Sequence, residues 1–143
     1  HSERAYYGTM QEDIPELVDY GLKYKPMLIS FGQYFTEDDT WIGTYHPKFD
    51  PDGQRTAKIW EKFSPRDAER WLFYHDKIVK YWIPAVLEYL YTPVPPPGQP
   101  NAFSRLFDNP EETGMKMQWL FMRPVDVYRD MFESPEAQAA WTK

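Results

Sequence analysis

The sequence contains no cysteine and only 7 glycines among its 143 residues. Without cysteine the chain has no disulfide framework, no thiol nucleophile and no zinc site built from thiolates. With so few glycines, a backbone loop that closely wraps a phosphate group is not expected. The chain also has no GxSxG elbow, phosphate-binding loop or dinucleotide-binding fingerprint. We therefore expect a protein without catalytic activity, bound metal or cofactor.

The sequence also has no cluster of basic residues and no long apolar stretch. The formal net charge is −6, and Lys and Arg form no stripe, so the electrostatic signature of a nucleic-acid-binding protein is missing. No stretch approaches the roughly 20 apolar residues that a membrane span requires, because Lys77, Lys80 and Glu88 interrupt the most apolar region. We expect no nucleic-acid partner and no transmembrane segment in this chain, whereas a position peripheral to a membrane agrees with the sequence.

Aromatic residues and proline are present in excess. Aromatics make up 18% of the chain, and there are 14 prolines, both above the usual composition of globular proteins. Aromatic side chains provide a large contact area on few rotatable bonds and are enriched at protein interfaces. The same side chains also fill small cores, so composition favours a partner surface and a core about equally.

Residues 64–91 carry the strongest periodic pattern. The stripe has the spacing of one helix face over about five turns and consists of Trp71, Leu72, His75, Ile78, Val79, Trp82, Ile83, Val86, Leu87 and Leu90. Ser64 and Asp67 have the spacing of a capping box, and Pro65 occupies the first helical position. Pro84 removes one helical hydrogen bond and clashes with the preceding turn, at a cost of about 3 kcal/mol or more. We expect one long amphipathic helix, kinked at Pro84.

Residues 1–63 are expected to form an N-terminal arm. It begins with an extended segment over residues 1–11, followed by a short helix that opens at Asp13 and ends before Pro26. Alternating apolar residues predict an extended segment or a single strand over 26–34. Residues 36–56 are expected to be a long loop anchored by aromatic residues, with a turn at its Asp-Pro-Asp-Gly sequence.

After the long helix, residues 92–100 are expected to form an extended proline-rich strap that leads the chain away. Residues 101–143 predict short helices, one of them from Pro110 to about Met122 although Gly114 weakens it. The others are expected at residues 102–107, 125–132 and 134–141. The sequence thus predicts a single domain over residues 1–143, of mainly α class, with one long kinked amphipathic helix, several short helices and extended arms rich in proline and aromatic residues.

Three patterns in the sequence bear on possible chemistry. His75 lies on the apolar stripe, which favours a structural role over that of a ligand or an acid/base group. The acidic run Glu37-Asp38-Asp39 is typical of a solvated loop, although it leaves open a hydrolase that combines a carboxylate with His75. A calcium loop with Gly53 at its sixth position would place Lys48 first and Ile59 last, where acidic ligands are needed, so that site is rejected.

Several residues are candidates for contact with a protein partner. They are the large aromatic and apolar side chains of the long helix and the arms, together with the centre of the strap: Trp41, Tyr45, Trp71, Trp82, Leu90, Pro95, Pro96, Pro97 and Trp119. A methionine cluster in the last third of the chain suits either an adaptable protein contact or core packing. It consists of Met115, Met117, Met122 and Met131.

The chain begins with His1 rather than Met, which predicts that a targeting segment was removed. In composition, and not in any motif, it resembles the supernumerary subunits of mitochondrial inner-membrane complexes such as respiratory enzymes and ATP synthase. That resemblance implies a non-catalytic accessory subunit with a structural or assembly role, packed at the periphery of the complex against other protein subunits. The alternative is a self-contained secreted or periplasmic module whose aromatic residues line a small-ligand pocket.

Overall fold

The computed structural model describes residues 14–23 and 27–141 of the chain. Within them the structure is mainly helical, with one two-stranded sheet, so the predicted mainly α class is confirmed. The expected extended segment over residues 1–11 and both limits of the first predicted helix lie outside the described residues. Between those limits the structure has η1, a short 3-10 helix at Pro15–Val18. None of the helices in the described part combines the length and the apolar content needed to cross a membrane.

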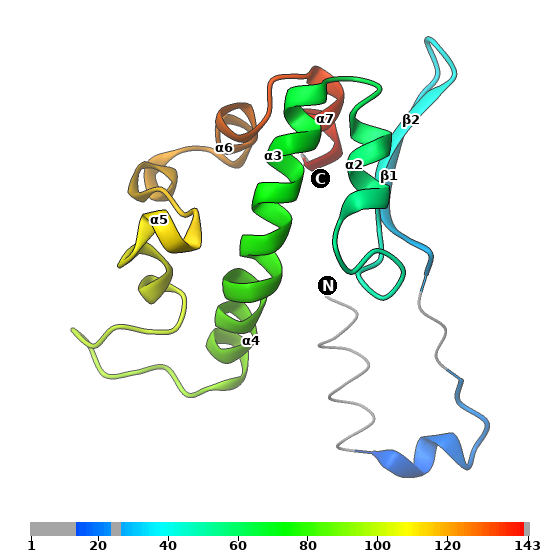
Figure 1. Ribbon diagram of the computed structural model, residues 1–143. Coiled ribbons are helices and arrows are strands. Elements are labelled where there is room, and N and C mark those ends of the chain that lie inside the picture. The colour runs from blue at the N-terminus through cyan, green and yellow to red at the C-terminus, as the bar shows by residue number, and fades with distance from the viewer. Residues whose placement is uncertain (1–13, 24–26, 142–143) are drawn as a thin grey trace.

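The region of strongest periodicity contains three consecutive helical segments. They are α3 (Pro65–Lys77), the π-helical segment η2 (Ile78–Trp82) and α4 (Ile83–Tyr91) (Figure 1). The backbone N–H of Ile83 donates to the carbonyl of Ile78, five residues earlier. This wider turn lies directly before Pro84, which has no N–H to donate and whose ring crowds the preceding turn of a regular α-helix.

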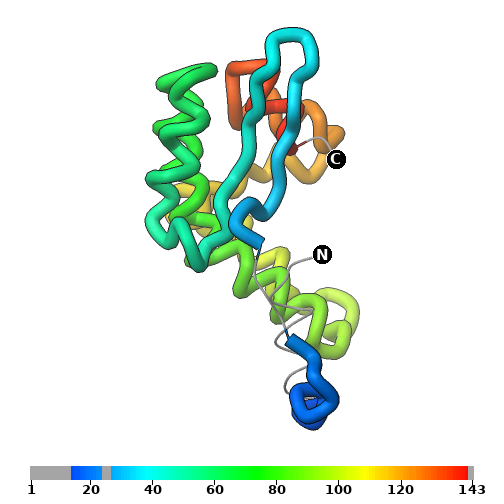
Figure 2. Tube along the Cα trace, turned by 90° about the vertical axis from the view of Figure 1, so that its right-hand side faces the viewer, coloured from blue at the N-terminus to red at the C-terminus, as the bar shows by residue number. Residues whose placement is uncertain are grey.

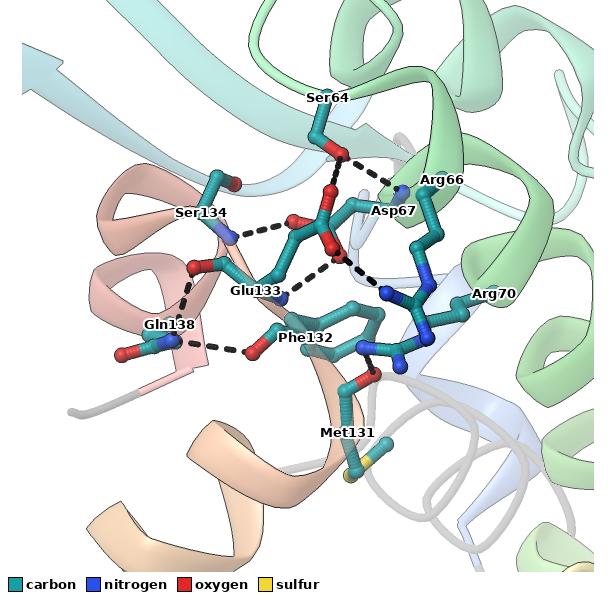
Figure 3. A network of polar contacts seen from close by, with 9 residues as sticks. All are labelled: Ser64, Arg66, Asp67, Arg70, Met131, Phe132, Glu133, Ser134 and Gln138. Atoms are coloured by element: carbon teal, nitrogen blue, oxygen red, sulfur yellow. Dashed lines mark hydrogen bonds and ion pairs between the residues drawn. The ribbon is translucent and has the colours of Figure 1, made fainter.

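The start of α3 shows one predicted feature and one correction. Ser64 Oγ accepts a hydrogen bond from the backbone N–H of Asp67 at 3.1 Å, and Pro65 is the first helical residue, as predicted. The predicted capping box is wrong because the Asp67 carboxylate does not turn back toward Ser64. It accepts hydrogen bonds from the backbone N–H groups of Glu133 and Ser134, both at 2.8 Å (Figure 3). Asp67, which the sequence predicts as a helix cap, therefore joins the start of α3 to residues 133–134.

The predicted long loop over residues 36–56 is wrong. Strands β1 (Ile29–Phe35) and β2 (Thr40–Tyr45) pair antiparallel as a hairpin, and helix α2 (Gln54–Trp60) follows. The acidic run forms the exposed hairpin turn, in which Asp39 has a positive φ of 58°. Asp38 accepts hydrogen bonds from the backbone N–H and the hydroxyl of Thr40 at 3.2 and 2.6 Å. Acidic side chains that serve as turn formers thus connect two strands.

The predicted Asp-Pro-Asp-Gly turn is present and starts α2. The buried Asp50 carboxylate accepts from the backbone N–H groups of Arg55 and Thr56 at 2.9 and 2.8 Å and from the Thr56 hydroxyl at 2.6 Å. Burial raises the pKa of Asp50, but these hydrogen bonds outweigh burial, so its pKa is lowered on balance. The ionised carboxylate therefore stabilises the first turn of α2.

The hydrophobic core is centred where α2, α3, the hairpin and α7 (Pro135–Trp141) meet, and it continues to buried side chains within residues 106–131. Trp60, Ile42 and Phe132 are fully buried there. The Trp60 ring centroid is 5.2 Å from that of Trp71 on α3 and 4.9 Å from that of Phe132. In both views α4 extends away from this part of the molecule (Figure 1 and Figure 2). The first half of the long helical region thus contributes buried residues to the core, whereas the second half contributes only partly buried ones such as Trp82 and Ala85.

The C-terminal third contains short helices, as predicted, but one boundary is wrong. In place of one helix to Met122, α5 (Pro110–Thr113) ends at Gly114, which has φ 72°. The 3-10 helix η4 (Met117–Phe121) follows separately. A left-handed residue interrupts the α-helical hydrogen-bond pattern, and glycine adopts this conformation without steric cost. The predicted short helices are confirmed as η3 (Ser104–Phe107), α6 (Pro124–Met131) and α7.

The proline-rich strap does not lead the chain away from α4. It contains a turn in which the backbone N–H of Gln99 donates to the Pro96 carbonyl at 3.1 Å. Beyond the strap, Arg105 forms an ion pair with Glu88 of α4, and the Phe103 ring lies 6.2 Å from that of Tyr89. The strap is therefore a connection that returns the chain to the side of α4.

Candidate functional site

An apolar groove with a volume of about 320 Å³ lies between η2 and the short C-terminal helices. We call it the aromatic groove. Its aromatic lining comes from η2, η3, η4, α6 and α7 and consists of Trp82, Phe103, Phe107, Trp119, Tyr128 and Trp141. Its remaining lining residues are Met115, Leu120, Met122, Pro124, Val127 and Met131. Residues far apart in the sequence thus form one continuous apolar surface.

Two tryptophans shape this groove. Trp82 and Trp119 pack edge to face, with ring centroids 6.2 Å apart. The Trp82 indole N–H donates to the Thr113 carbonyl, and the Trp119 indole N–H donates to Asp130 Oδ2, each at 2.7 Å. Because protein acceptors satisfy both indole N–H groups, the two rings contribute only carbon surface to a ligand.

Asp130 anchors one wall of the groove from outside. Its carboxylate accepts from Lys116 Nζ at 2.6 Å as well as from Trp119. Burial raises the pKa of Asp130, but the hydrogen bonds from Lys116 and Trp119 together with the positive charge of Lys116 lower it on balance. The carboxylate is therefore ionised at neutral pH and acts as a hydrogen-bond acceptor for the wall rather than as a proton donor.

Methionine and tryptophan complete the lining. Of the predicted methionine cluster, Met115, Met122 and Met131 line the groove, whereas Met117 is exposed and not part of the lining. Thioether side chains adapt to differently shaped contacts. Trp141 Nε1 is buried and has no hydrogen-bond partner among the described residues. The groove thus combines adaptable walls with one unpaired buried donor in a lining residue.

The structure brings together only two of the predicted contact residues, Trp82 and Trp119. Trp71 is buried in the core, where its indole N–H donates to the Gly53 carbonyl at 3.1 Å. Tyr45 is half-buried, and the Arg55 guanidinium carbon lies 4.1 Å from its ring centroid. The others are spread over the hairpin, α4 and the strap: Trp41, Leu90, Pro96 and Pro97 are exposed and Pro95 is half-buried.

Sequence reasoning did not select Phe103, Val127, Tyr128 or Trp141 for this site. Phe103 directly precedes η3, and the others lie on α6 and α7. No local pattern indicates that these segments meet. The one available signal was the apolar face of the short helix α6. Periodicity identifies such a face but does not identify the elements that pack on it.

His75 has the environment of a core residue. It is buried on α3, and its ring centroid lies 5.5 Å from that of Trp71. A Cβ atom on Gly53 would come within 2.9 Å of the His75 ring, so glycine is required for this close approach. Burial lowers the pKa of His75, while the nearby carboxylates of Asp50, Asp52 and Asp76 oppose that shift. The imidazole is thus predominantly neutral at pH 7.

Substitution of His75 with glutamine is expected to reduce the pH dependence of folding. Since the pKa of folded His75 lies below its ordinary value of 6.5, the unfolded chain binds this proton more readily. Stability from the neutral side chain is present above pH 6.5 and is lost as the pH falls through the folded pKa. Urea unfolding should show a smaller loss of stability between pH 7.5 and 5.5 in His75→Gln than in the wild type. Parallel curves over that window would contradict the assignment.

No group of three or more His, Asp or Glu side chains in the described part of the chain is placed to hold a metal ion. Comparison of the chain with protein-family models, with curated proteins and with solved structures gives no match.

Proposed function

We propose that the chain is a non-catalytic accessory subunit of a larger protein assembly, in which it has a structural role. The observation that carries this proposal is the surface of α4. We call Val86, Tyr89, Leu90 and Tyr91 the α4 surface; these side chains are between 38% and 60% exposed. Neither η2 nor α4 contains a buried residue. An apolar helix face that stays this exposed is typical of a docking surface.

Charge supports the same proposal. The only charged residue of α4 is Glu88, and it forms an ion pair with Arg105. A partner that covers the α4 surface therefore has to desolvate few unpaired charges, which favours an apolar, uncharged partner surface. In this proposal residues 64–91 act as one long amphipathic helix, kinked at Pro84. Its α3 half anchors the subunit in its own core, and its α4 half binds the neighbouring subunit.

The exposed parts of the hairpin and of the strap would provide further contacts. Trp41 on β2 and the prolines Pro96 and Pro97 are exposed. These arms, rich in aromatic residues and proline, would extend along a neighbouring subunit, since aromatic side chains are enriched at interfaces.

The proposed location is the periphery of a mitochondrial inner-membrane energy-transducing complex, either a respiratory complex or ATP synthase. Its support is the compositional resemblance to the supernumerary subunits of those complexes, namely an excess of aromatic residues and proline without a catalytic motif.

Size-exclusion chromatography of detergent extracts from the source cells tests the assembly proposal, with the chain located by mass spectrometry. The wild-type chain should co-elute with a large assembly, whose other members then identify the complex. Leu90→Glu places a charge on the α4 surface and should shift the chain to free-chain fractions. Leu120→Glu, a matched change at an exposed leucine of the aromatic groove, should stay with the assembly. Elution of the wild type as a free chain would refute the proposal.

The aromatic groove favours a second candidate, a self-contained secreted or periplasmic module that binds a small ligand. Concave sites lined by aromatic and apolar side chains are typical of such modules. A self-contained module should be monomeric when expressed alone and unfold in one cooperative transition. An accessory subunit should instead aggregate through the uncovered α4 surface or lose α4 locally.

A further inference from the structure

We propose that the aromatic groove binds a small, neutral, largely hydrocarbon ligand of about the size of two fused aromatic rings. The inference rests on the groove and not on the α4 surface, so it holds whether or not the chain belongs to an assembly. It also deepens the second candidate function, because it names the chemical class of the ligand.

The size of the ligand follows from the volume of the groove. At about 320 Å³, the groove reaches the lower end of the range for small-molecule sites, which runs from about 300 to 1,000 Å³. It has about twice the volume of an engineered apolar cavity of about 150 Å³ that binds benzene. A ligand of two fused rings, or a branched hydrocarbon of that size, therefore matches the space.

The polarity of the ligand follows from the hydrogen bonds that the polar groups of the groove already make within the protein. The indole N–H groups of Trp82 and Trp119 are already bonded to Thr113 and Asp130. Asp130 is in turn paired with Lys116. A charged ligand would lose its hydration and gain only one neutral donor, the unpaired indole N–H of Trp141, which is costly. Burial of hydrocarbon against ring faces and thioethers is favourable, at about 25 cal/mol per Å² of apolar area.

The walls can adapt to such a ligand. Leu120 is 50% exposed, and it lies on η4, a 3-10 helix of five residues. The methionines Met115 and Met122 add flexible side chains to the lining. Short helices and thioether side chains permit small repacking around a ligand while the α3 core remains unchanged.

A fluorescence titration of the purified chain with 1-naphthylamine, a probe of two fused rings that is neutral at pH 7, tests this inference. Because tryptophan emission overlaps the absorption of the probe, energy transfer reports binding to the chain. The chain has 6 tryptophans, so the comparison of the two glutamate variants locates the site. We expect saturable binding at one site. Leu120→Glu should weaken the affinity at least tenfold, since it places a charge in the apolar lining. Leu90→Glu, which places the same charge on the α4 surface, should bind like the wild type.

A second groove variant tests the inference in case Leu120→Glu does not fold. Met122→Gln keeps the length of the side chain but adds a polar amide to the wall, and it should weaken binding about threefold or more. Circular dichroism should show the wild-type helical signal for each variant. Unsaturable binding by the wild type, or equal affinities for Leu120→Glu and Leu90→Glu, would overturn the inference. Neither result bears on the assembly proposal, which the chromatography of Leu90→Glu decides separately.

Discussion

Replacement of Asp67 with asparagine is expected to lower the free energy of unfolding by about 3 kcal/mol, because hydrogen bonds to a charged group contribute about 1.5 to 3 kcal/mol each. Asp67 is fully buried, and its two carboxylate oxygens accept the backbone N–H groups of Glu133 and Ser134. Asparagine keeps one acceptor, but its NH₂ group faces the other N–H donor. One backbone N–H would therefore be buried without a partner.

The surrounding contacts explain why this carboxylate has a large effect. Ser64 Oγ donates to Glu133 Oε1 at 2.7 Å, and Arg70 donates to the Met131 carbonyl at 3.2 Å (Figure 3). Together with Asp67 they join the start of α3 to the segment between α6 and α7. Loss of the central acceptor weakens the attachment of the whole C-terminal third, and polar networks of this kind are more sensitive to one deletion than a single pair.

Urea denaturation followed by circular dichroism measures the change. The matched control is Asp76→Asn on the same helix, where the side chain is 67% exposed and the expected change is below about 0.5 kcal/mol. If Asp67→Asn lost no more stability than Asp76→Asn, the buried carboxylate would not be the link between α3 and the C-terminal third.

Replacement of Trp60 with alanine is expected to destabilise the chain by about 4 kcal/mol, within the range measured for aromatic deletions in cores. Trp60 is 0% exposed and contacts the rings of Trp71 and Phe132. Its indole N–H donates to the Gly43 carbonyl of β2 at 3.0 Å. Alanine would leave a cavity between α2 and α3 and a buried carbonyl without its donor.

Trp41→Ala provides the control for this substitution, since Trp41 lies on the neighbouring strand and is 42% exposed. Its loss should cost about 1 kcal/mol or less. Thermal unfolding of both variants separates the two cases. A similar shift of the unfolding temperature for both tryptophans would place the core elsewhere than between α2, α3 and the hairpin.

Local signals account for the helix starts that were predicted correctly. Ser64-Pro65 and Ser134-Pro135 each place a capping side chain before a proline, and α3 and α7 begin at those prolines. The chemistry of a cap involves only neighbouring residues, so it can be read without knowledge of the fold. The sequence predicts that Gly114 weakens a longer helix, and in the structure this glycine terminates α5.

The hairpin was missed because its evidence is not local. The alternation of apolar residues in β1 predicts one extended segment. That segment becomes part of a sheet only by pairing with β2, and the hairpin is buried only by contact with α2 and α7. Strand propensity reflects the packing of a half-buried surface more than it reflects the backbone itself. For the same reason the sequence predicts the acidic run as part of a loop and not as the turn of a hairpin.

By itself the sequence determined the mainly α class, the helix starts at Pro65 and Pro135 and the turn at Asp50, all of which depend on interactions between near neighbours. Only the tertiary structure decided that Asp67 links α3 to the C-terminal third, that Trp71 is buried while α4 has no buried residue, and that Trp82 and Trp119 share a groove. These features require contacts between residues that are distant in sequence. Such contacts form only when the whole chain folds. A local sequence pattern identifies the apolar face of a helix or strand, but it does not predict the element against which that face packs.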